Sequence, residues 1–261
     1  MIGLFLGDTD FSESVLKNIK KLKKKYFIID FSRNFKFKKN KYAYRISIGK
    51  FGRILSLIKE KKSKKVLFAG KIVKPKLSSL KLDFKGIYYM PSIISAAKKG
   101  DAAIIKAIIK ILNNEGIKVI SSISFNSELA LKSGNYTKQK PNNRDLASIK
   151  KGIKYFNKLN DLDHVQALIV NDNKIVAKEG REGTRKMLAK LKKKTQGLLI
   201  KFPKKKQDLR MDLPTIGLQT LKDCKKYGLK GIILKSKENI ILERAKCIHF
   251  ANKNRIFIKV V

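Results

Sequence analysis

The chain has no tryptophan and contains only two cysteines and two histidines among its 261 residues. Two cysteines cannot build a disulfide scaffold or a four-thiolate zinc site, and Cys224 falls inside a helical pattern. His164 and His249 lie far apart in the sequence, which argues against a histidine-rich metal cluster and a Ser-His-Asp triad. We expect each histidine to have a structural role, and the sparse cysteines fit a reducing compartment.

Long apolar runs are also missing. The longest, AAIIKAIIKIL at residues 102–112, is interrupted by Lys106 and Lys110 and falls short of the roughly 20 apolar residues that a membrane span needs. The first residues, MIGLFLGDTDF, have no basic leader and reach Asp8 and Asp10 at once, so they make a poor signal peptide. We therefore expect a cytoplasmic protein without a membrane-spanning segment.

Acidic residues are scarce beside basic ones, because 20 Asp and Glu face 62 Lys and Arg and leave a net charge of +42. Apolar residues still make up 43% of the chain, which favours a globular fold over disorder. The lysine runs are scattered along the chain, and no recognisable nucleic-acid-binding module accompanies them. Two interpretations stay open: a bias that fills solvated positions with lysine, and attraction for an anionic partner such as nucleic acid, nucleotides or an acidic membrane.

Short apolar runs alternate with helical patterns in the first half of the chain. Strands are predicted at residues 2–7, 26–31, 65–70 and 117–123, and helices at 12–25, 51–62 and 101–112. Asp101 is a suitable N-cap for the last helix, and Gly116 is a suitable stop signal. The alternation predicts an α/β fold.

A polar, aperiodic stretch at residues 124–145, with Pro141 inside it, predicts a connection between two domains, 1–132 and 133–261. Beyond it we expect a helix at 143–158 and a hairpin that turns at residues 171–173. A strand at 197–203 and a helix that opens with Pro214 should follow, before the final strand-like runs. The second half is therefore also expected to be α/β.

No Walker loop, dinucleotide-binding glycine fingerprint or zincin helix is present. Polar residues instead follow strand-like runs or precede helices, at Gly70-Lys71, Gly100-Asp101, Glu179–Thr184 and Gln207–Asp212. Helix N-termini with lysine or threonine nearby can hold phosphate oxygens, and carboxylates there can hold Mg²⁺. Helix capping alone would also explain any one of these positions.

The densest polar set is KFPKKKQDLRMDLPTIG, from Lys201 to Gly217. It places lysines, a glutamine, two aspartates and an arginine before a helix that we expect to start at Pro214. A structural interpretation makes Asp212 an N-cap and pairs Asp208 with Arg210 on the surface. A functional interpretation uses the aspartates for Mg²⁺ and for orienting water.

The sequence resembles the LpxI type of UDP-2,3-diacylglucosamine pyrophosphatase over nearly its whole length. The resemblance rests on four segments: IGKFGRILSLIK with VLFAGKIVKP, PSIISAAKKGDAAIIKAI, AKEGREGTRKML and QDLRMDLPTIG. It implies two α/β domains with a substrate cleft between them, the first a nucleotide-sugar-binding-like domain and the second catalytic. It also implies hydrolysis of UDP-2,3-diacylglucosamine to UMP and 2,3-diacylglucosamine 1-phosphate in lipid A biosynthesis, with Mg²⁺ or a similar divalent cation.

The resemblance assigns roles to individual residues. Asp212 matches the essential aspartate and is the expected catalytic residue, and the expected metal ligands are Asp212, Asp208 and Glu182. The expected substrate-binding residues are Gly70, Lys71, Gly100, Asp101, Gln166, Thr184, Lys201, Gln207, Arg210 and Met211. Unrelated enzymes that make the same product use a two-metal centre rich in histidine, which two histidines cannot build.

The chain departs from the family pattern at three places. Gly7-Asp8-Thr9-Asp10 replaces a glycine-rich first turn, Asp163-His164-Val165-Gln166 replaces D-x-G-Q, and Arg185 stands where the family tends to have aspartate. A guanidinium at position 185 could bind a phosphate oxygen directly. The alternatives are a non-catalytic binding module of the same fold and a basic nucleic-acid-binding protein.

The substrate that the resemblance implies carries acyl chains, which reside in a bilayer. We therefore expect peripheral association with an anionic membrane surface, at the inner face of the inner membrane, and no specific nucleic acid partner.

Overall fold

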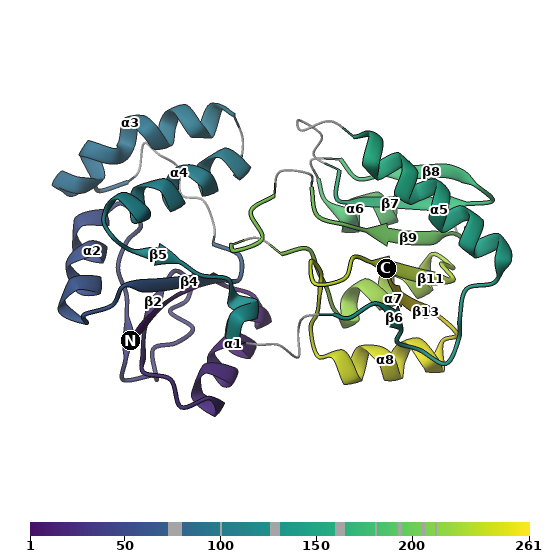
Figure 1. The fold of residues 1–261 in the computed structure, drawn as a ribbon, viewed down its shortest axis with the longest axis horizontal. Coiled ribbons are helices and arrows are strands. Elements are labelled where there is room, and N and C mark those ends of the chain that lie inside the picture. The colour runs from purple at the N-terminus through teal and green to yellow at the C-terminus, as the bar shows by residue number, and fades with distance from the viewer. Residues whose placement is uncertain are drawn as a thin grey trace. The chain divides into compact units, whose positions relative to one another are not determined.

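The computed structural model describes residues 1–72, 80–99, 101–125, 131–159, 165–180, 182–192, 195–204, 207–211 and 213–261 (Figure 1). The chain folds into two compact units. Unit 1 holds Met1–Ser127 and Asp208–Asp212, and unit 2 holds Glu128–Gln207 and Leu213–Val261. The sequence predicts a single domain boundary, between residues 132 and 133. Both units combine helices with strands, which confirms the predicted fold class of two α/β domains.

Unit 1 is built on a parallel five-stranded sheet in the order β3-β2-β1-β4-β5. Its strands are β1 (Ile2–Leu6), β2 (Tyr26–Asp30), β3 (Ala43–Tyr44), β4 (Lys65–Ala69) and β5 (Lys118–Val119). The chain leaves β1 on one side to form β2 and returns to the other side for β4, so the strand order reverses at β1. In such sheets, ligands bind beyond the carboxyl ends of the strands at this switch point.

The helices of unit 1 are α1 (Asp10–Lys21), α2 (Phe51–Glu60), α3 (Phe84–Lys98) and α4 (Asp101–Asn114), with a short 3-10 helix at Ser122–Phe125. Gly116, at φ +74°, ends α4 because its N–H and that of Ile117 bond back to the carbonyls of Asn113 and Leu112. The predicted stop signal is therefore confirmed. The strand predicted at 117–123 is wrong beyond Val119, because the chain leaves the sheet after Ile120 and forms the 3-10 helix.

Unit 2 contains a six-stranded mixed sheet in the order β6-β13-β11-β9-β7-β8 and a two-stranded sheet, β10-β12. The six strands are β6 (Gly134–Asn135), β7 (Ala167–Asn171), β8 (Lys174–Lys178), β9 (Leu198–Lys201), β11 (Gly231–Leu234) and β13 (Phe257–Val260). β9, β11 and β13 are parallel, whereas β7 runs antiparallel to both β8 and β9. The start of β7 therefore lies beside the ends of β8 and β9.

The helices of unit 2 are α5 (Asn143–Lys158), α6 (Thr184–Ala189), α7 (Leu218–Lys226) and α8 (Arg244–Lys253). α5 occupies the predicted range, and the β7–β8 hairpin turns through residues 172 and 173, both at positive φ. Both predictions are confirmed.

The predicted helix start at Pro214 is wrong. Thr215–Ile216 form β10 and pair with β12 (Ile240–Ile241), while the carbonyl of Pro214 accepts the N–H of Ile240 at 3.0 Å. Helix α7 begins only at Leu218, after an extended Gly217. Strand pairing has therefore overridden the local preference of proline for a helix start, and Asp212 is not the N-cap of this helix.

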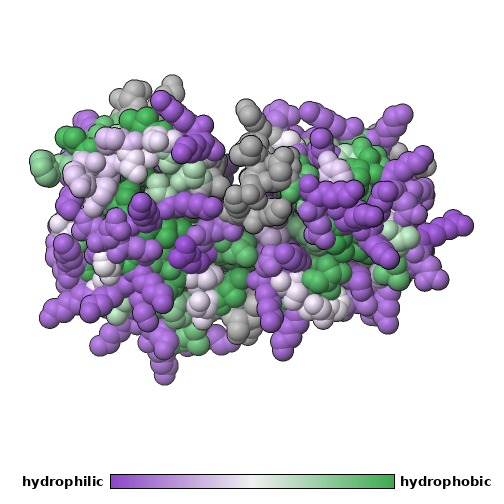
Figure 2. Space-filling model, turned by 45° about the horizontal axis from the view of Figure 1, so that its top comes forward, coloured by the Kyte–Doolittle hydropathy of each residue, from purple (hydrophilic) through white to green (hydrophobic). Residues whose placement is uncertain are grey.

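The surface is dominated by hydrophilic side chains, as expected from the excess of lysine. Figure 2 shows purple residues over most of the visible face of each unit, with apolar residues in green between them. Cys224 and Cys247 are buried free thiols in the core of unit 2. Among the described residues, no helix has the length and hydropathy that a bilayer span requires.

Candidate functional site

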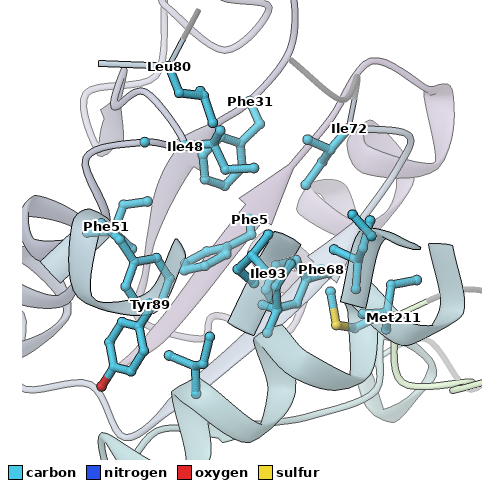
Figure 3. Close-up of a pocket in the computed structure, with 18 of the residues that line it drawn as sticks. Phe5, Phe31, Ile48, Phe51, Phe68, Ile72, Leu80, Tyr89, Ile93 and Met211 are labelled. Carbon is cyan, nitrogen blue, oxygen red and sulfur yellow. The ribbon is translucent and has the colours of Figure 1, made fainter. Parts of the chain in front are cut away.

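A cavity of about 810 Å³ opens in unit 1 at the carboxyl ends of its central strands. Phe5 of β1, Phe68 of β4 and Phe31, which follows β2, form its floor (Figure 3). Helices α2, α3 and α4 supply further apolar side chains to its walls. Met211 also lines it, although it comes from the second half of the sequence, because residues 208–211 belong to unit 1.

Aromatic contacts hold the walls of this cavity in place. The ring of Phe5 packs edge-to-face on Phe31 and on Phe68, with centroids 5.7 and 4.7 Å apart. Phe51 of α2 makes the same kind of contact with Tyr89 of α3, at 5.5 Å. Edge-to-face pairs are directional, so they fix ring positions as well as burying apolar area. The cavity is therefore a shaped apolar site.

Tyr89 ties α3 to the end of α4. Its ring borders the cavity while its hydroxyl points away (Figure 3), and that hydroxyl donates to Glu115 Oε1 at 2.6 Å. Lys85 Nζ donates to the same oxygen, also at 2.6 Å. These bonds from Lys85 and Tyr89 keep the pKa of the Glu115 carboxyl below its usual value, although its side chain is only 11% exposed.

Two predicted substrate-binding residues, Gly70 and Lys71, lie on the rim of the cavity. Gly70 has φ +84°, and a Cβ there would meet Ser12 Oγ at 2.1 Å. Ser12 Oγ bonds to the carbonyls of Gly7 and Ala69, so the glycine allows the ends of β1 and β4 to be fastened together. Together with Met211, three predicted residues are thus brought to one cavity.

Two carboxylates near this edge of the sheet form hydrogen bonds and ion pairs within unit 1. Both carboxylate oxygens of the buried Asp30, at the end of β2, accept backbone N–H groups, one from Ser32 and one from Phe37, each at 2.8 Å. Asp8, in the first turn, accepts the backbone N–H of Arg33 and pairs with its guanidinium at 3.1 Å. The backbone bond and the guanidinium lower the pKa of Asp8. These two carboxylates close loops around the apolar cavity.

Unit 2 brings four predicted substrate-binding residues together with Glu179, and we call these five residues the polar cluster: Gln166, Glu179, Thr184, Lys201 and Gln207. The sheet explains the meeting, because Gln166 precedes β7, Glu179 follows β8 and Lys201 ends β9. The antiparallel register places Ala167 opposite Lys201 and Leu168 opposite Lys178. The start of one strand and the ends of its two neighbours therefore converge at one edge.

A continuous hydrogen-bond chain runs through the polar cluster. Lys201 Nζ donates to Thr184 Oγ1 at 3.2 Å, and that hydroxyl donates to Glu179 Oε1 at 2.8 Å. Glu179 is only 7% exposed, and its other carboxylate oxygen accepts the backbone N–H of Gln166 at 3.0 Å. The Gln166 side-chain amide then donates to Gln207 Oε1 at 2.6 Å. Each group holds the next, so the orientations of Lys201 and of the two amides are coupled.

Three other predicted residues are engaged in ion pairs outside the polar cluster. Arg210 binds Asp208 through two side-chain bonds of 2.9 and 2.6 Å, and these bonds, with a nearby Lys106, lower the pKa of Asp208. Glu182 is exposed and pairs with Lys186 and Lys190, which lower its pKa in that order. The predicted roles of Asp208 and Glu182 as metal ligands stay predictions.

Asp212, Gly100 and His164 lie outside the described residues, as does the side chain of Asp101, whose backbone begins α4. In the described parts of the chain, there is no group of three or more His, Cys, Asp or Glu side chains that could hold a metal ion. Arg185, the departure from the family pattern, lies 3.8 Å from Asp223 in an ion pair. The catalytic assignment of Asp212 therefore rests on the sequence.

Sequence reasoning missed two functional features. Glu179 was noted only as part of a polar segment, yet its buried carboxylate joins Thr184 to Gln166. The aromatic floor of the cavity was read as ordinary strand core. Its signal was the phenylalanine near the end of each central strand, at positions 5, 31 and 68, where parallel sheets bind ligands.

Comparisons with known proteins agree with the two-unit architecture. The LpxI N-terminal domain family matches residues 1–129, and the LpxI C-terminal domain family matches residues 132–259. A relative from Caulobacter vibrioides, named UDP-2,3-diacylglucosamine pyrophosphatase LpxI, is 30% identical over 223 residues, which is 82% of this chain and 80% of the relative. The chain belongs to the LpxI family and is an enzyme of the hydrolase class.

Proposed function

We propose that this enzyme hydrolyses the pyrophosphate bond of UDP-2,3-diacylglucosamine, giving UMP and 2,3-diacylglucosamine 1-phosphate for lipid A biosynthesis. The name of the Caulobacter relative supports this substrate. The observation of this chain that carries the proposal is the apolar cavity of unit 1, since a nucleotide sugar without acyl chains would have no use for it.

The acyl chains are assigned to this cavity. Its volume of about 810 Å³ falls in the range of small-molecule sites, and phenylalanine, isoleucine, leucine and methionine make up most of its lining. Each methylene transferred from water to such surroundings contributes roughly 0.8 kcal/mol, so a few methylenes already supply substantial affinity. No carboxylate is among the residues that line the described cavity, which also suits an acyl chain.

The charged diphosphate is assigned to the polar cluster of unit 2. Lys201 would offset the negative charge that builds on the leaving phosphate, and the bond from its ammonium to Thr184 fixes its position. The amides of Gln166 and Gln207 would bind phosphate or sugar oxygens. Gln207 belongs to unit 2 and Met211 to unit 1, so one short stretch of chain serves both sites.

We also propose that the reaction requires Mg²⁺, as the family resemblance implies. The described carboxylates do not form a closed site, because Asp208 and Glu182 each have cationic partners. Mg²⁺ is commonly held by one or two carboxylates together with substrate phosphates, and Asp212 is the residue proposed for this role. Removing divalent ions with EDTA should abolish hydrolysis, and restoring Mg²⁺ should recover it.

The test is release of UMP from UDP-2,3-diacylglucosamine by the purified chain with Mg²⁺. Asp212→Asn should reduce turnover by roughly 10² to 10⁴-fold or more, with substrate binding and melting temperature retained, because the charge is needed chiefly in the transition state. No UMP release by the wild-type chain would overturn the proposed reaction. Normal turnover by Asp212→Asn would overturn the catalytic assignment alone.

The cavity assignment has its own test. Ala97, on the wall formed by α3, is replaced by phenylalanine to occupy the space of the acyl chains. The KM for the diacyl substrate should rise at least about tenfold, the effect of losing two buried methylenes. Ala147→Phe, at an exposed position of α5, is the matched control and should leave the KM unchanged. An unchanged KM for Ala97→Phe would refute the assignment of the acyl chains to this cavity.

The same substrate leads us to propose that the enzyme works at the inner face of the inner membrane. Its acyl chains keep the substrate in a bilayer, and a net charge of +42 favours an anionic lipid surface. Association that is lost at high salt is the expected behaviour.

A further inference from the structure

Helix α3 is apolar on two opposite faces. Its inner face, with Gly86, Met90 and Ile93, lines the cavity of unit 1. Several of its larger apolar residues point instead to solvent, since Phe84 is 84% exposed, Tyr88 68% and Ile87 61%. A contiguous apolar patch on the solvent side of a helix commonly marks a surface that binds a protein or a membrane.

We define the α3 outer face as Phe84, Ile87, Tyr88, Pro91 and Ile94, all of them exposed. Their spacing of three or four residues keeps them on one side of the helix. The other large apolar residues that are exposed in the described chain are spread over separate elements: Met1, Leu22, Tyr42, Leu146 and Val176. Figure 2, in which the top of Figure 1 comes forward, shows green residues gathered along the upper edge of unit 1, over α3.

Exposed lysines lie at both ends of the α3 outer face. Lys81 precedes the helix, and Lys98 and Lys99 lie at its end, all exposed. The segment 84–99 contains no aspartate or glutamate. Two carboxylates that bind this helix are used internally, since Asp83 accepts three backbone N–H groups and Glu115 binds Lys85 and Tyr89.

We infer that the α3 outer face is the surface by which this enzyme docks on an anionic lipid bilayer. Aromatic and aliphatic side chains enter the headgroup boundary, while lysines at both ends of the helix contact anionic headgroups. With 15 residues, α3 is about 22 Å long, too short to span a hydrocarbon core, so it lies in the plane of the surface. A protein partner would need neither these terminal lysines nor a cavity beneath the same helix.

The inference rests on the proposed function, because the acyl chains of the proposed substrate are the reason for the enzyme to bind a bilayer. A docked α3 separates the bilayer from the cavity by a single helix, since Tyr88 faces outward and Tyr89 borders the cavity. Acyl chains leaving the bilayer would pass beside α3 without crossing water. The helix is also held firmly enough to dock, because Asp83 caps it and Glu115 fastens it to the end of α4.

The first experiment is sedimentation of the full chain with vesicles of phosphatidylglycerol and phosphatidylethanolamine, or of phosphatidylcholine alone. The triple variant Phe84→Ser, Ile87→Ser, Tyr88→Ser should bind the anionic vesicles at least about tenfold more weakly than wild type. A matched variant removes three exposed apolar residues elsewhere, Leu22→Ser, Leu146→Ser, Val176→Ser, and should bind as wild type does. Equal binding by wild type and the α3 variant, or equal loss in the matched variant, would overturn the inference.

A second experiment does not depend on the triple variant folding. Because the chain has no tryptophan, Tyr88→Trp creates a single reporter on the α3 outer face, and Leu146→Trp creates one on α5. With anionic vesicles, emission from Tyr88→Trp should shift to the blue and be quenched by lipids brominated on their acyl chains, whereas emission from Leu146→Trp should not. An unshifted Tyr88→Trp spectrum would overturn the inference.

The outcomes separate this inference from the proposed function. Hydrolysis is measured with substrate in detergent micelles, where docking on a bilayer is not needed, and the α3 variant should keep wild-type turnover there. Loss of vesicle binding with hydrolysis retained supports the docking surface. Normal vesicle binding by the α3 variant refutes it, and light scattering that showed a dimer broken by this variant would identify a second copy as the occupant. Absence of hydrolysis in every protein would instead refute the proposed function.

Discussion

Replacing Thr184 by valine tests whether the polar cluster acts as one unit. Valine keeps the shape of threonine and removes the hydroxyl that accepts from Lys201 Nζ and donates to Glu179 Oε1. Glu179 would then keep the backbone N–H of Gln166 as its described partner. The substitution therefore interrupts the chain of bonds at its middle while leaving the packing of α6 in place.

The expected loss of stability in Thr184→Val follows from the burial of Glu179. Removing one partner from a buried charged acceptor costs roughly 1.5–3 kcal/mol, and the residue is only 7% exposed, so the upper part of that range applies. At about 3 °C per kcal/mol for a unit of this size, a loss of roughly 2–3 kcal/mol should lower the melting temperature of unit 2 by roughly 6–9 °C. Because Lys201 also loses the bond that positions it, turnover should fall more than tenfold, with a smaller change in KM.

The assay combines calorimetric melting with UMP release at saturating substrate. Thr184→Ser keeps the hydroxyl and should restore most of both losses. Thr195→Val is the matched control, because its hydroxyl bonds to a backbone carbonyl near the surface and should cost little. A Thr184→Val protein with wild-type melting and wild-type turnover would refute the reasoning, since the hydroxyl would then join nothing of consequence.

Three further predictions follow from particular contacts. Glu115→Gln should destabilise unit 1 by about 1–2 kcal/mol in urea at pH 7, discounted because Lys85 is half exposed. Since the folded-state pKa of Glu115 is lowered, its contribution is complete above the ordinary carboxyl pKa and disappears as the pH falls through the lowered value, so variant and wild type should converge in acid. Burial raises the pKa of Cys247 to about 11, so a thiol reagent at pH 8 should label it only after denaturant is added; rapid labelling of the native protein would contradict its burial. Gly152→Ala should lower stability by about 1–3 kcal/mol despite the better helix propensity of alanine, because a Cβ there would lie 2.2 Å from the buried Ile200; an increase in the urea midpoint would show that Ile200 can move aside.

Elements with strong local signals could be predicted from the sequence. Helix α4 ends where Gly116 allows a positive φ, and α5 begins after Asn142, whose side chain and that of Asp145 cap each other's backbone N–H groups. The β7–β8 hairpin follows from the Asp172-Asn173 turn, because these residue types tolerate left-handed backbone. In each case the residues that decide the structure are neighbours in the sequence.

Other elements are decided by contacts between distant residues, and local patterns failed there. Pro214 resembles a helix start, but the pairing of β10 with β12 keeps the chain extended until Gly217. Helix α3 carries exposed apolar residues and contains Pro91, so it shows neither a clear helical period nor an uninterrupted run. The feature that hid α3 from the sequence analysis is the one that makes its outer face a docking surface.

The residues of the candidate site were also predicted only in part, because their types are local but their meeting depends on the fold. Segments that follow strands were recognised as polar, and the family resemblance selected Gln166, Thr184 and Lys201 among them. That they meet depends on the antiparallel position of β7 between β8 and β9, which no local pattern encodes. The sequence places Glu179 in a polar segment but gives it no role of its own, and only the fold shows its carboxylate buried between two donors.

The short segment Gln207–Met211 contributes to both candidate sites. Gln207 closes the hydrogen-bond chain of the polar cluster in unit 2, whereas Met211 lines the apolar cavity of unit 1. Between them, Asp208 and Arg210 bind each other at 2.6 Å, so the two charges are matched inside a stretch of chain that leaves one unit and enters the other. A substrate with a charged diphosphate and apolar acyl chains needs both kinds of surface. A run of five residues that combines polar and apolar side chains can supply both.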